Sequence, residues 1–259
     1  MNELIRIGVL QLLAAYLFLI IIIFIVRKRG IGREQEIFLA AARMTIQLIL
    51  VGFLLEYVFS QEHFLYTVVI LIIMLIFAVR NIFSRIKLSI KPELKRVVII
   101  SMLSGSLLSI LYFLFVVLSL DPWYHPRYFI LISGMIIGNS MTGVALGVER
   151  LISGMNDRKE LIEGALMLGA RPSLAAKSVV NDTFSAAILP TVNSMVGMGI
   201  VFLPGMMTGQ ILAGVSPLRA IEYQIAIMLG ILGSVSLTVY LLVHFGYRAF
   251  FNSRDQLQL

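Results

Sequence analysis

Residues 163–172, EGALMLGARP, are the polar passage around which the rest of a largely apolar chain is arranged. Asp157, followed three residues later by Glu160, matches a capping box, which predicts that a helix begins there. Gly169 occupies the position expected for the glycine that ends this helix, and Pro172 is placed to open the next one. The stretch therefore predicts a short amphipathic helix, a glycine hinge and a second helix.

The composition is that of a membrane protein. Hydrophobic residues make up 59% of the chain and charged residues only 14%, which is more apolar than a soluble domain of this length requires. Cysteine is absent, and this excludes a disulfide framework and a thiolate metal site. The net charge of +7 would suggest nucleic acid in a soluble protein. Here the basic residues follow the membrane instead, so no nucleic-acid partner is expected.

Seven apolar runs follow one another along the chain, and a run of about 20 residues crosses a hydrocarbon core of about 30 Å as a helix. They cover residues 7–26, 37–59, 64–83, 97–120, 128–148, 183–218 and 225–245. We therefore expect an all-α polytopic membrane helix bundle of about seven spans. The bundle should form one transmembrane domain over residues 1–259, embedded in the lipid bilayer.

The basic residues indicate how this bundle is oriented. Of the 21 Lys and Arg residues, 17 fall in the segments that the span order assigns to one side. Three lie on the other side, at Arg6, Arg127 and Arg219, and Arg43 lies within a span. Because Lys and Arg accumulate in cytoplasmic loops, the N-terminus is expected outside and the C-terminus in the cytoplasm. The loop of residues 149–182 is then cytoplasmic.

The sixth apolar run is unusual because residues 183–218 contain no charged residue. These 36 residues are too many for one straight span and too few for two. Pro190 and Pro204, with several glycines between and after them, predict a span that is broken or re-entrant. The sequence leaves open which of these two forms it takes.

Several polar and thioether side chains within the spans are candidates for a transport pathway. Unwound backbone with polar groups is how many transporters line a midplane site, although methionine also serves as a gap filler in packed cores. Arg43 is either functional or extends to the cytoplasmic surface. Asn139 faces a pathway or packs against a helix, and its small neighbours favour packing. The candidates are Arg43, Gln47, Asn139, Asn193, Ser194, Met198, Met206, Met207 and Gln210.

Two sets of residues carry a family resemblance. The passage from Glu163 to Ala170 resembles the cytoplasmic EAA loop of ABC-transporter permeases, whose pattern is E-A-A-x-x-x-G-A. The runs GARPS (169–173), AAILPTVNS (186–194) and LPGMMTG (203–209) resemble the FetB family (UPF0014). This family comprises bacterial permeases linked to iron export and plant relatives linked to aluminium tolerance. The resemblance extends over nearly the whole chain.

The resemblance implies a permease subunit of an ABC transporter in the bacterial cytoplasmic (inner) membrane, which exports iron. A separate ATPase subunit would dock on the loop of residues 157–175. Two copies of that subunit would serve a homodimer of this chain, and ATP-Mg would bind to the partner. No cofactor is expected in this chain, which lacks a G-x-x-x-x-G-K phosphate loop and is not expected to be an enzyme. The expected coupling residues are Glu163, Gly164, Ala165, Gly169, Ala170, Arg171 and Pro172.

Other interpretations remain open at this point. The helix before Gly169 would otherwise only cover the membrane end of the bundle. The cargo would otherwise be another metal or a small organic solute, or the chain would be an ATP-independent carrier or channel, although such proteins usually carry paired acids or histidines in their spans. The three histidines are not spaced as a ligand pair, so the metal site is unknown. Thioethers suit Cu(I) better than iron.

Overall fold

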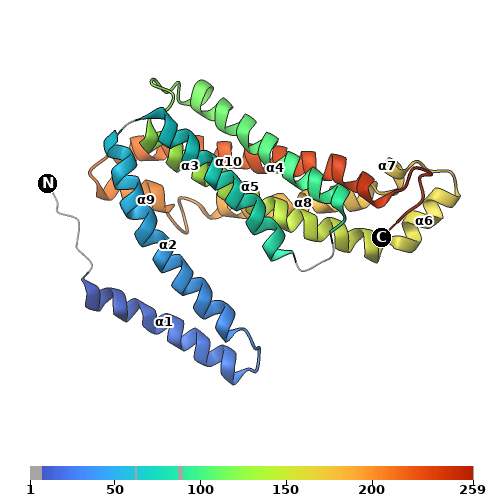
Figure 1. Ribbon diagram of the computed structural model, residues 1–259, viewed down its shortest axis with the longest axis horizontal. Helices are drawn as coiled ribbons and strands as arrows, with labels where there is room; N and C mark the ends of the chain where they lie inside the picture. The colour runs from blue at the N-terminus through green and yellow to red at the C-terminus, as the bar shows by residue number, and fades with distance from the viewer. Residues whose placement is uncertain (1–7, 62, 87–89, 259) are drawn as a thin grey trace. The chain divides into compact units, whose positions relative to one another are not determined.

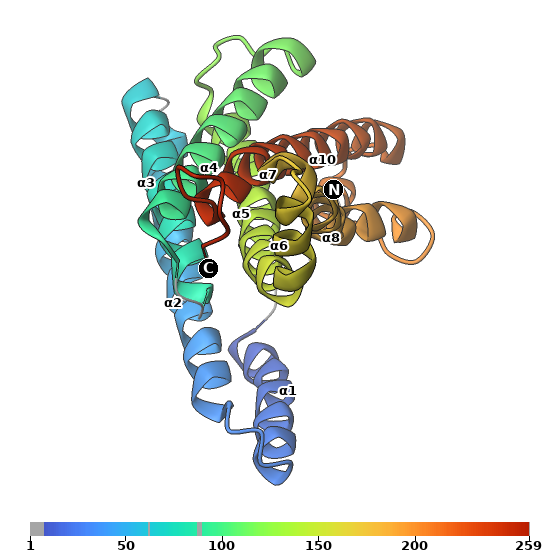
Figure 2. The same ribbon diagram turned by 90° about the vertical axis from the view of Figure 1, so that its right-hand side faces the viewer.

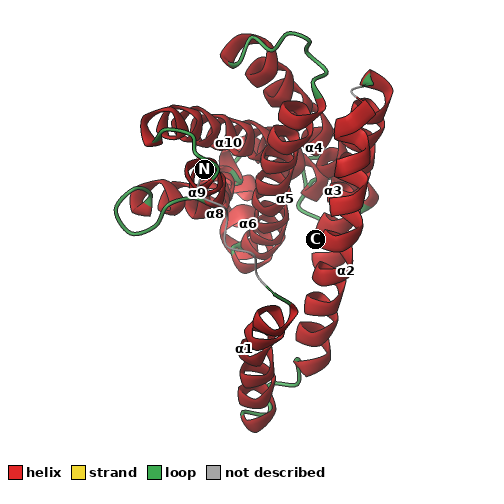
Figure 3. Cartoon of the chain, turned by 90° about the vertical axis from the view of Figure 1, so that its left-hand side faces the viewer, coloured by secondary structure: helices red, strands yellow, loops and turns green. Residues whose placement is uncertain are grey.

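The structure is a computed structural model that describes residues 8–61, 63–86 and 90–258. Within these ranges the chain forms helices joined by loops, with two isolated β-bridges and no named strand (Figure 3). The predicted all-α class is therefore confirmed. Arg6 and Lys87, two of the basic residues used to predict the orientation, lie outside the described residues.

The chain divides into two compact units, the first of which contains α1 (Val9–Lys28) and α2 (Glu34–Gln61). The turn between these helices contains Gly30 and Gly32 with φ of 64° and 72°, a conformation that glycine adopts without steric cost. The Thr45 hydroxyl donates to the carbonyl of Ala41 at 2.9 Å. It therefore accepts the hydrogen bond that links it to the Tyr16 hydroxyl on α1.

The second unit contains the remaining helices. Proline opens α4, α5 and α10 at the first helical positions, where its missing N–H is not needed. The helices are α3 (Phe64–Arg85), α4 (Pro92–Tyr112), the π-helix η1 (Phe113–Val117), α5 (Pro126–Asp157), α6 (Lys159–Met167), α7 (Pro172–Ala175), α8 (Lys177–Gly197), α9 (Gly205–Leu212), α10 (Pro217–Gly246) and the 3-10 helix η2 (Tyr247–Phe250) (Figure 1).

Small residues allow α10 to pack closely against α4 and α5. A Cβ atom on Gly105 of α4 would lie 2.8 Å from the Cα of Thr238 on α10. The buried hydroxyls of Ser140 on α5 and Ser234 on α10 are hydrogen-bonded at 2.8 Å.

The small residues Ser101, Gly105 and Ser109 recur every four positions, which predicts a packing ridge on the fourth span, α4, and the structure confirms it at Gly105. The small residues Gly134, Gly138 and Ala145 predict a similar ridge on α5. A Cβ on Gly134 would lie 3.6 Å from Met74 of α3, whereas no atom lies within 4 Å of a Cβ on Gly138, so the ridge makes contact at Gly134 and not at Gly138.

The charge-free stretch of residues 183–218 is interrupted, but not where its first proline stands. α8 continues through Pro190 to Gly197, residues 198–204 are not helical, and α9 follows. The left-handed φ of 85° at Gly199 marks the break. Six of the described helices are long and apolar enough to span a membrane, and α8 is not among them. The seven-span count therefore stays a prediction.

The helix α5 is longer than a membrane span requires. α5 has 32 residues, and at 1.5 Å per residue it is about 48 Å long, more than a hydrocarbon core of about 30 Å. α6 and α7 follow at its C-terminal end, close to the C-terminus of the chain (Figures 1 and 2). The Lys91 ammonium at the start of α4 donates to the carbonyl of Gln258. That this basic end is cytoplasmic stays a prediction.

Candidate functional site

The predicted glycine hinge has the geometry of a Schellman motif. The Gly169 N–H donates to the carbonyl of Leu166 at 2.9 Å, and the Ala170 N–H donates to that of Ala165 at 3.0 Å. Gly169 has φ of 87°, which a residue with a side chain adopts only with strain. Pro172 then opens α7 at its first position. The predicted helix end, hinge and restart are therefore confirmed.

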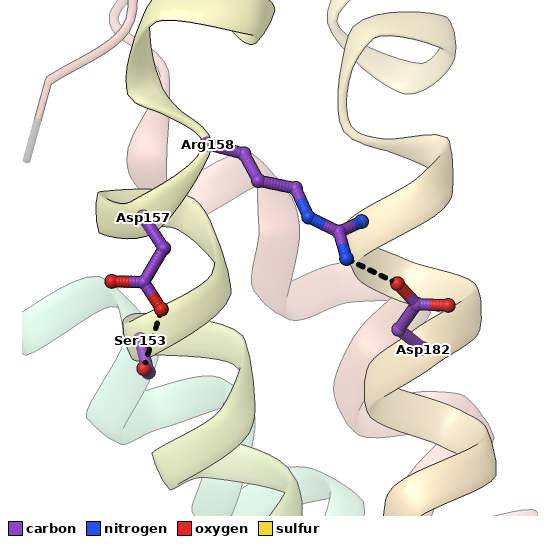
Figure 4. Close-up of polar contacts among 4 residues, drawn as sticks. All are labelled: Ser153, Asp157, Arg158 and Asp182. Carbon is purple, nitrogen blue, oxygen red and sulfur yellow. Dashed lines mark hydrogen bonds and ion pairs between the residues drawn. The ribbon is translucent and has the colours of Figure 1, made fainter.

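The predicted capping box, by contrast, does not form. Asp157 is the last residue of α5 and accepts a hydrogen bond from the Ser153 hydroxyl at 3.0 Å (Figure 4). The N-cap of α6 is Arg158, whose side chain makes no capping bond. A capping carboxylate needs an extended residue before the helix. Here α5 continues to the residue directly before Arg158, so Asp157 is helical.

An ion pair holds the start of α6 against α8. Arg158 Nη2 lies 2.6 Å from Asp182 Oδ2 (Figure 4). Both side chains are partly exposed, so the pair contributes at most about 1 kcal/mol to stability. The pair matters for position more than for stability, because it links Arg158, between α5 and α6, to α8. The sequence reading did not identify this pair, since its two residues lie 24 positions apart.

The segment from α6 to α7 leaves large apolar side chains exposed. Ile162 is buried, so one face of α6 packs on the bundle. Four other side chains are between 63% and 91% exposed: Leu161, Met167, Leu168 and Leu174. We call this set the apolar elbow surface. It follows the C-terminal end of α5, and an exposed apolar patch of this kind marks a contact with a partner or with the membrane interface.

The predicted coupling residues lie in and beside this surface. Glu163 is half-buried, and its carboxylate lies 3.8 Å from the Lys159 ammonium, one turn earlier on α6. Gly164 and Ala165 are half-buried on the same helix, and Arg171 is the exposed N-cap of α7. The structure thus brings together the predicted coupling set of Glu163, Gly164, Ala165, Gly169, Ala170, Arg171 and Pro172. Their coupling role stays a prediction.

The second candidate site lies where α8 is interrupted. Two cavities of about 380 Å³ and 300 Å³ share Met198, Gln224 and Met228 in their linings. Their walls come from α5, α8, α9 and α10 and from the loop after α8. The structure therefore brings together five of the predicted pathway residues, which are Asn139, Ser194, Met198, Met206 and Met207.

The other predicted pathway residues lie outside these two linings. Asn193 is exposed on α8, and Gln210 is a half-buried residue of α9 whose side-chain oxygen has no partner. Arg43 and Gln47 are exposed residues of α2, in the first unit. Asn139, by contrast, is one of the cavity residues, and it makes a hydrogen bond within its own helix. Its amide donates to the carbonyl of Met135 on its own helix at 2.8 Å.

Gln224 is the cavity residue that the sequence reading missed. It is 7% exposed, its Nε2 lies 3.8 Å from the sulfur of Met198, and its Oε1 is buried without a hydrogen-bond partner. The last apolar run was counted from Ile225, one residue too late to include it. Pro217 directly after Ser216 is a helix-start signal, and it would have placed Gln224 within the last helix.

The cavity linings contain no charged side chain. Among residues 8–61, 63–86 and 90–258 there is also no group of three or more His, Cys, Asp or Glu residues placed to hold a metal ion. Hard divalent cations are usually bound by carboxylate and other oxygen ligands. The two linings therefore offer thioethers, amides and the hydroxyls of Thr142, Thr191 and Ser194 to a solute, and no carboxylates.

Comparisons with known proteins place these features in a family. The profile of the Uncharacterised protein family (UPF0014) matches residues 9–251. The "Probable iron export permease protein FetB" of Escherichia coli (strain K12) is 34% identical over 95% of this chain and 93% of its own length. The "UPF0014 membrane protein YjkA" of Bacillus subtilis (strain 168) is 32% identical over 96% and 98%.

A plant protein is similar over the same extent. The "Protein ALUMINUM SENSITIVE 3" of Arabidopsis thaliana is 31% identical over 97% of this chain and 90% of its own length. No solved structure matches the chain. The matches to the bacterial and plant proteins span the elbow, the interrupted helix and the long helices of both units. The chain belongs to the UPF0014 family of membrane proteins.

Proposed function

We propose that this chain is the membrane permease subunit of an ABC transporter, driven by a separate ATPase subunit that docks on residues 157–175. The observation that carries the proposal is the apolar elbow surface. Met167 and Leu168 are 86% and 91% exposed on the segment after α5, and an apolar patch on a loop predicted to be cytoplasmic favours a protein partner. The printed name of the Escherichia coli relative contains the word permease, which supports the same function.

The contacts around the elbow suggest how a partner would act on the bundle. α6 packs through Ile162, and Arg158 on its N-terminal side is paired with Asp182 on α8. A displacement of α6 about the hinge at Gly169 therefore reaches α8. Since α8 lines the cavities at its far end, the partner's ATP-driven closure would rearrange the interrupted stretch from Pro190 to Gly209 and open a pathway. Two ATPase copies would act on a homodimer of this chain.

The proposed cargo is a metal, with iron first. This part of the proposal rests on the name of the Escherichia coli relative, a probable iron export permease. The direction of transport, export from the cytoplasm of a bacterium through its inner membrane, rests on the same relative. Another metal or a small organic solute is the alternative that an uncharged cavity also accommodates.

The test is reconstitution with a purified ABC ATPase subunit from the same organism. We expect the two proteins to co-purify and to support ATP-dependent iron transport in proteoliposomes. Leu168→Glu and Glu163→Lys should abolish co-purification, because they place or reverse charge on the docking surface. Gln35→Glu, which adds a charge at an exposed position of α2 in the first unit, is the control. Transport that continues without ATP, or docking that Leu168→Glu leaves intact, would contradict the proposal.

A further inference from the structure

Methionine is concentrated around the two cavities. Six of the 13 methionines of the chain line one or both of them: Met135, Met195, Met198, Met206, Met207 and Met228. They come from α5, α8, α9, α10 and the loop after α8. These elements are far apart in the sequence, and their methionines come together at the cavities.

A second observation points to a ligand in the same space. Gln224 lines both cavities, is more than nine-tenths buried, and has a side-chain oxygen without a partner. Leaving a buried polar atom unpaired costs about 1–3 kcal/mol. Its amide nitrogen already contacts the sulfur of Met198 at 3.8 Å. The free oxygen is therefore available to an electropositive solute that also contacts that methionine.

The chemistry of the linings selects among cations. Thioether sulfur is a soft ligand that favours Cu(I), whereas Mg²⁺, Ca²⁺ and Mn²⁺ suit carboxylate and water. The linings contain no charge to offset that of an ion. The free energy of removing an ion from water rises with the square of its charge. For ions of similar radius, it is therefore about four times smaller for a monovalent ion than for a divalent one. Bare Fe²⁺ fits these walls poorly on both counts.

We infer that the two cavities form a binding site for a soft monovalent metal ion of the Cu⁺ and Ag⁺ type, held by methionine sulfurs with Gln224 as an oxygen donor. Methionine has three rotatable bonds, which allow several sulfurs to converge on one ion and release it again. As a statement about cargo, the inference rests on the proposed function and adds a second class beside iron. As a statement about binding, it concerns this chain alone.

The test is Ag⁺ binding to the purified full-length protein in detergent, with no ATPase present, followed by X-ray absorption at the silver edge. Because the chain has no cysteine, a sulfur scatterer next to silver can only be a methionine. We expect saturable binding with a sulfur shell. The pair Met198→Leu and Met228→Leu should weaken binding at least about tenfold, and Gln224→Leu should cause a smaller loss.

Met102→Leu with Met155→Leu is the matched control, because both methionines are fully buried outside the cavities. This pair should leave Ag⁺ affinity unchanged and reports whether loss of buried methionine alone unfolds the protein. A silver shell of oxygen or nitrogen only, or equal losses in the two pairs, would overturn the inference. Ag⁺ binding without co-purification of an ATPase would refute the proposed function and leave the inference standing.

Discussion

The two sides of α10 are built in opposite ways. Toward α4 and α5, small residues bring the backbones together, as at Gly105 against Thr238 and in the Ser140–Ser234 hydrogen bond. Toward α8 and α9, the same helix borders two cavities through Gln224 and Met228. One face of α10 is therefore closely packed, and the other borders cavities along the N-terminal half of the helix, residues 221–231.

This difference assigns separate tasks to the two sides. A closely packed interface resists rearrangement, because its side chains interlock and leave few voids. α4, α5 and α10 thus form a fixed wall. α8, which the Arg158–Asp182 pair connects to the elbow, packs on α5 through Val179 and Ala187 but borders a cavity at its C-terminal end, so this end has room to change. Substitutions on each side can therefore separate stability from transport.

The largest effect on stability is expected from Gly105→Ala on the packed side. The added Cβ would lie 2.8 Å from the Cα of Thr238, so a backbone would have to move. Overpacking of this kind costs about 1–3 kcal/mol. The thermal unfolding midpoint of the purified protein should fall accordingly. Gly233→Ala is the control on α10, because no atom lies within 4 Å of a Cβ placed there, and it should not lower the unfolding midpoint. An equal fall in the midpoint for both variants would contradict a closely packed side.

The next effect is expected at the elbow, from Gly169→Ala. A side chain at φ of 87° costs about 1–2 kcal/mol, so the end of α6 should open more often. Amide hydrogen exchange of residues 165–170 should become about tenfold faster, while the global unfolding midpoint changes little. Gly164→Ala, within α6 and with open space around it, is the control and should slow exchange. Unchanged exchange in Gly169→Ala would show that an alanine adopts this backbone conformation without strain.

The elbow was predictable from sequence because its signals are local. Gly169 followed by Pro172 specifies a helix end and a restart within four residues, and the structure has both. The capping box failed for a non-local reason, since nothing near Asp157 shows how far α5 extends. In the same way, Pro190 is a helix breaker by composition, yet α8 continues through it.

The cavities were predictable in part. Met198, Met206 and Met207 stand close together in a stretch too long for one span, and this placed them in a pathway. Gln224 and Met228 line the same space from another helix. Their membership depends on how α10 packs, which no local pattern encodes. Gly138 shows the same limit, because small residues mark an available face but not which face a neighbour occupies.

A smaller effect is expected from the hydroxyl pair on the packed side. Ser140→Ala leaves the Ser234 hydroxyl without its partner, but that hydroxyl can turn to a carbonyl of its own helix. The loss should therefore be about 1 kcal/mol. The double substitution Ser140→Ala with Ser234→Ala should cost less than the sum of the single ones, measured by unfolding of both variants. Strict additivity would mean that the two hydroxyls do not interact.

The smallest effect on stability, and the sharpest distinction between the two sides, is expected from the Arg158–Asp182 pair. Both side chains are partly exposed, so Arg158→Ala should change the free energy of unfolding by less than about 1 kcal/mol. If α8 moves with α6 through this contact, Asp182→Ala, which lies outside the proposed docking segment, should keep ATPase binding and lose ATP-dependent transport. The charge-swapped pair, Arg158→Asp with Asp182→Arg, should recover part of it. Full transport in Asp182→Ala would leave the covalent path through Gly169 and α7 as the route from elbow to cavity.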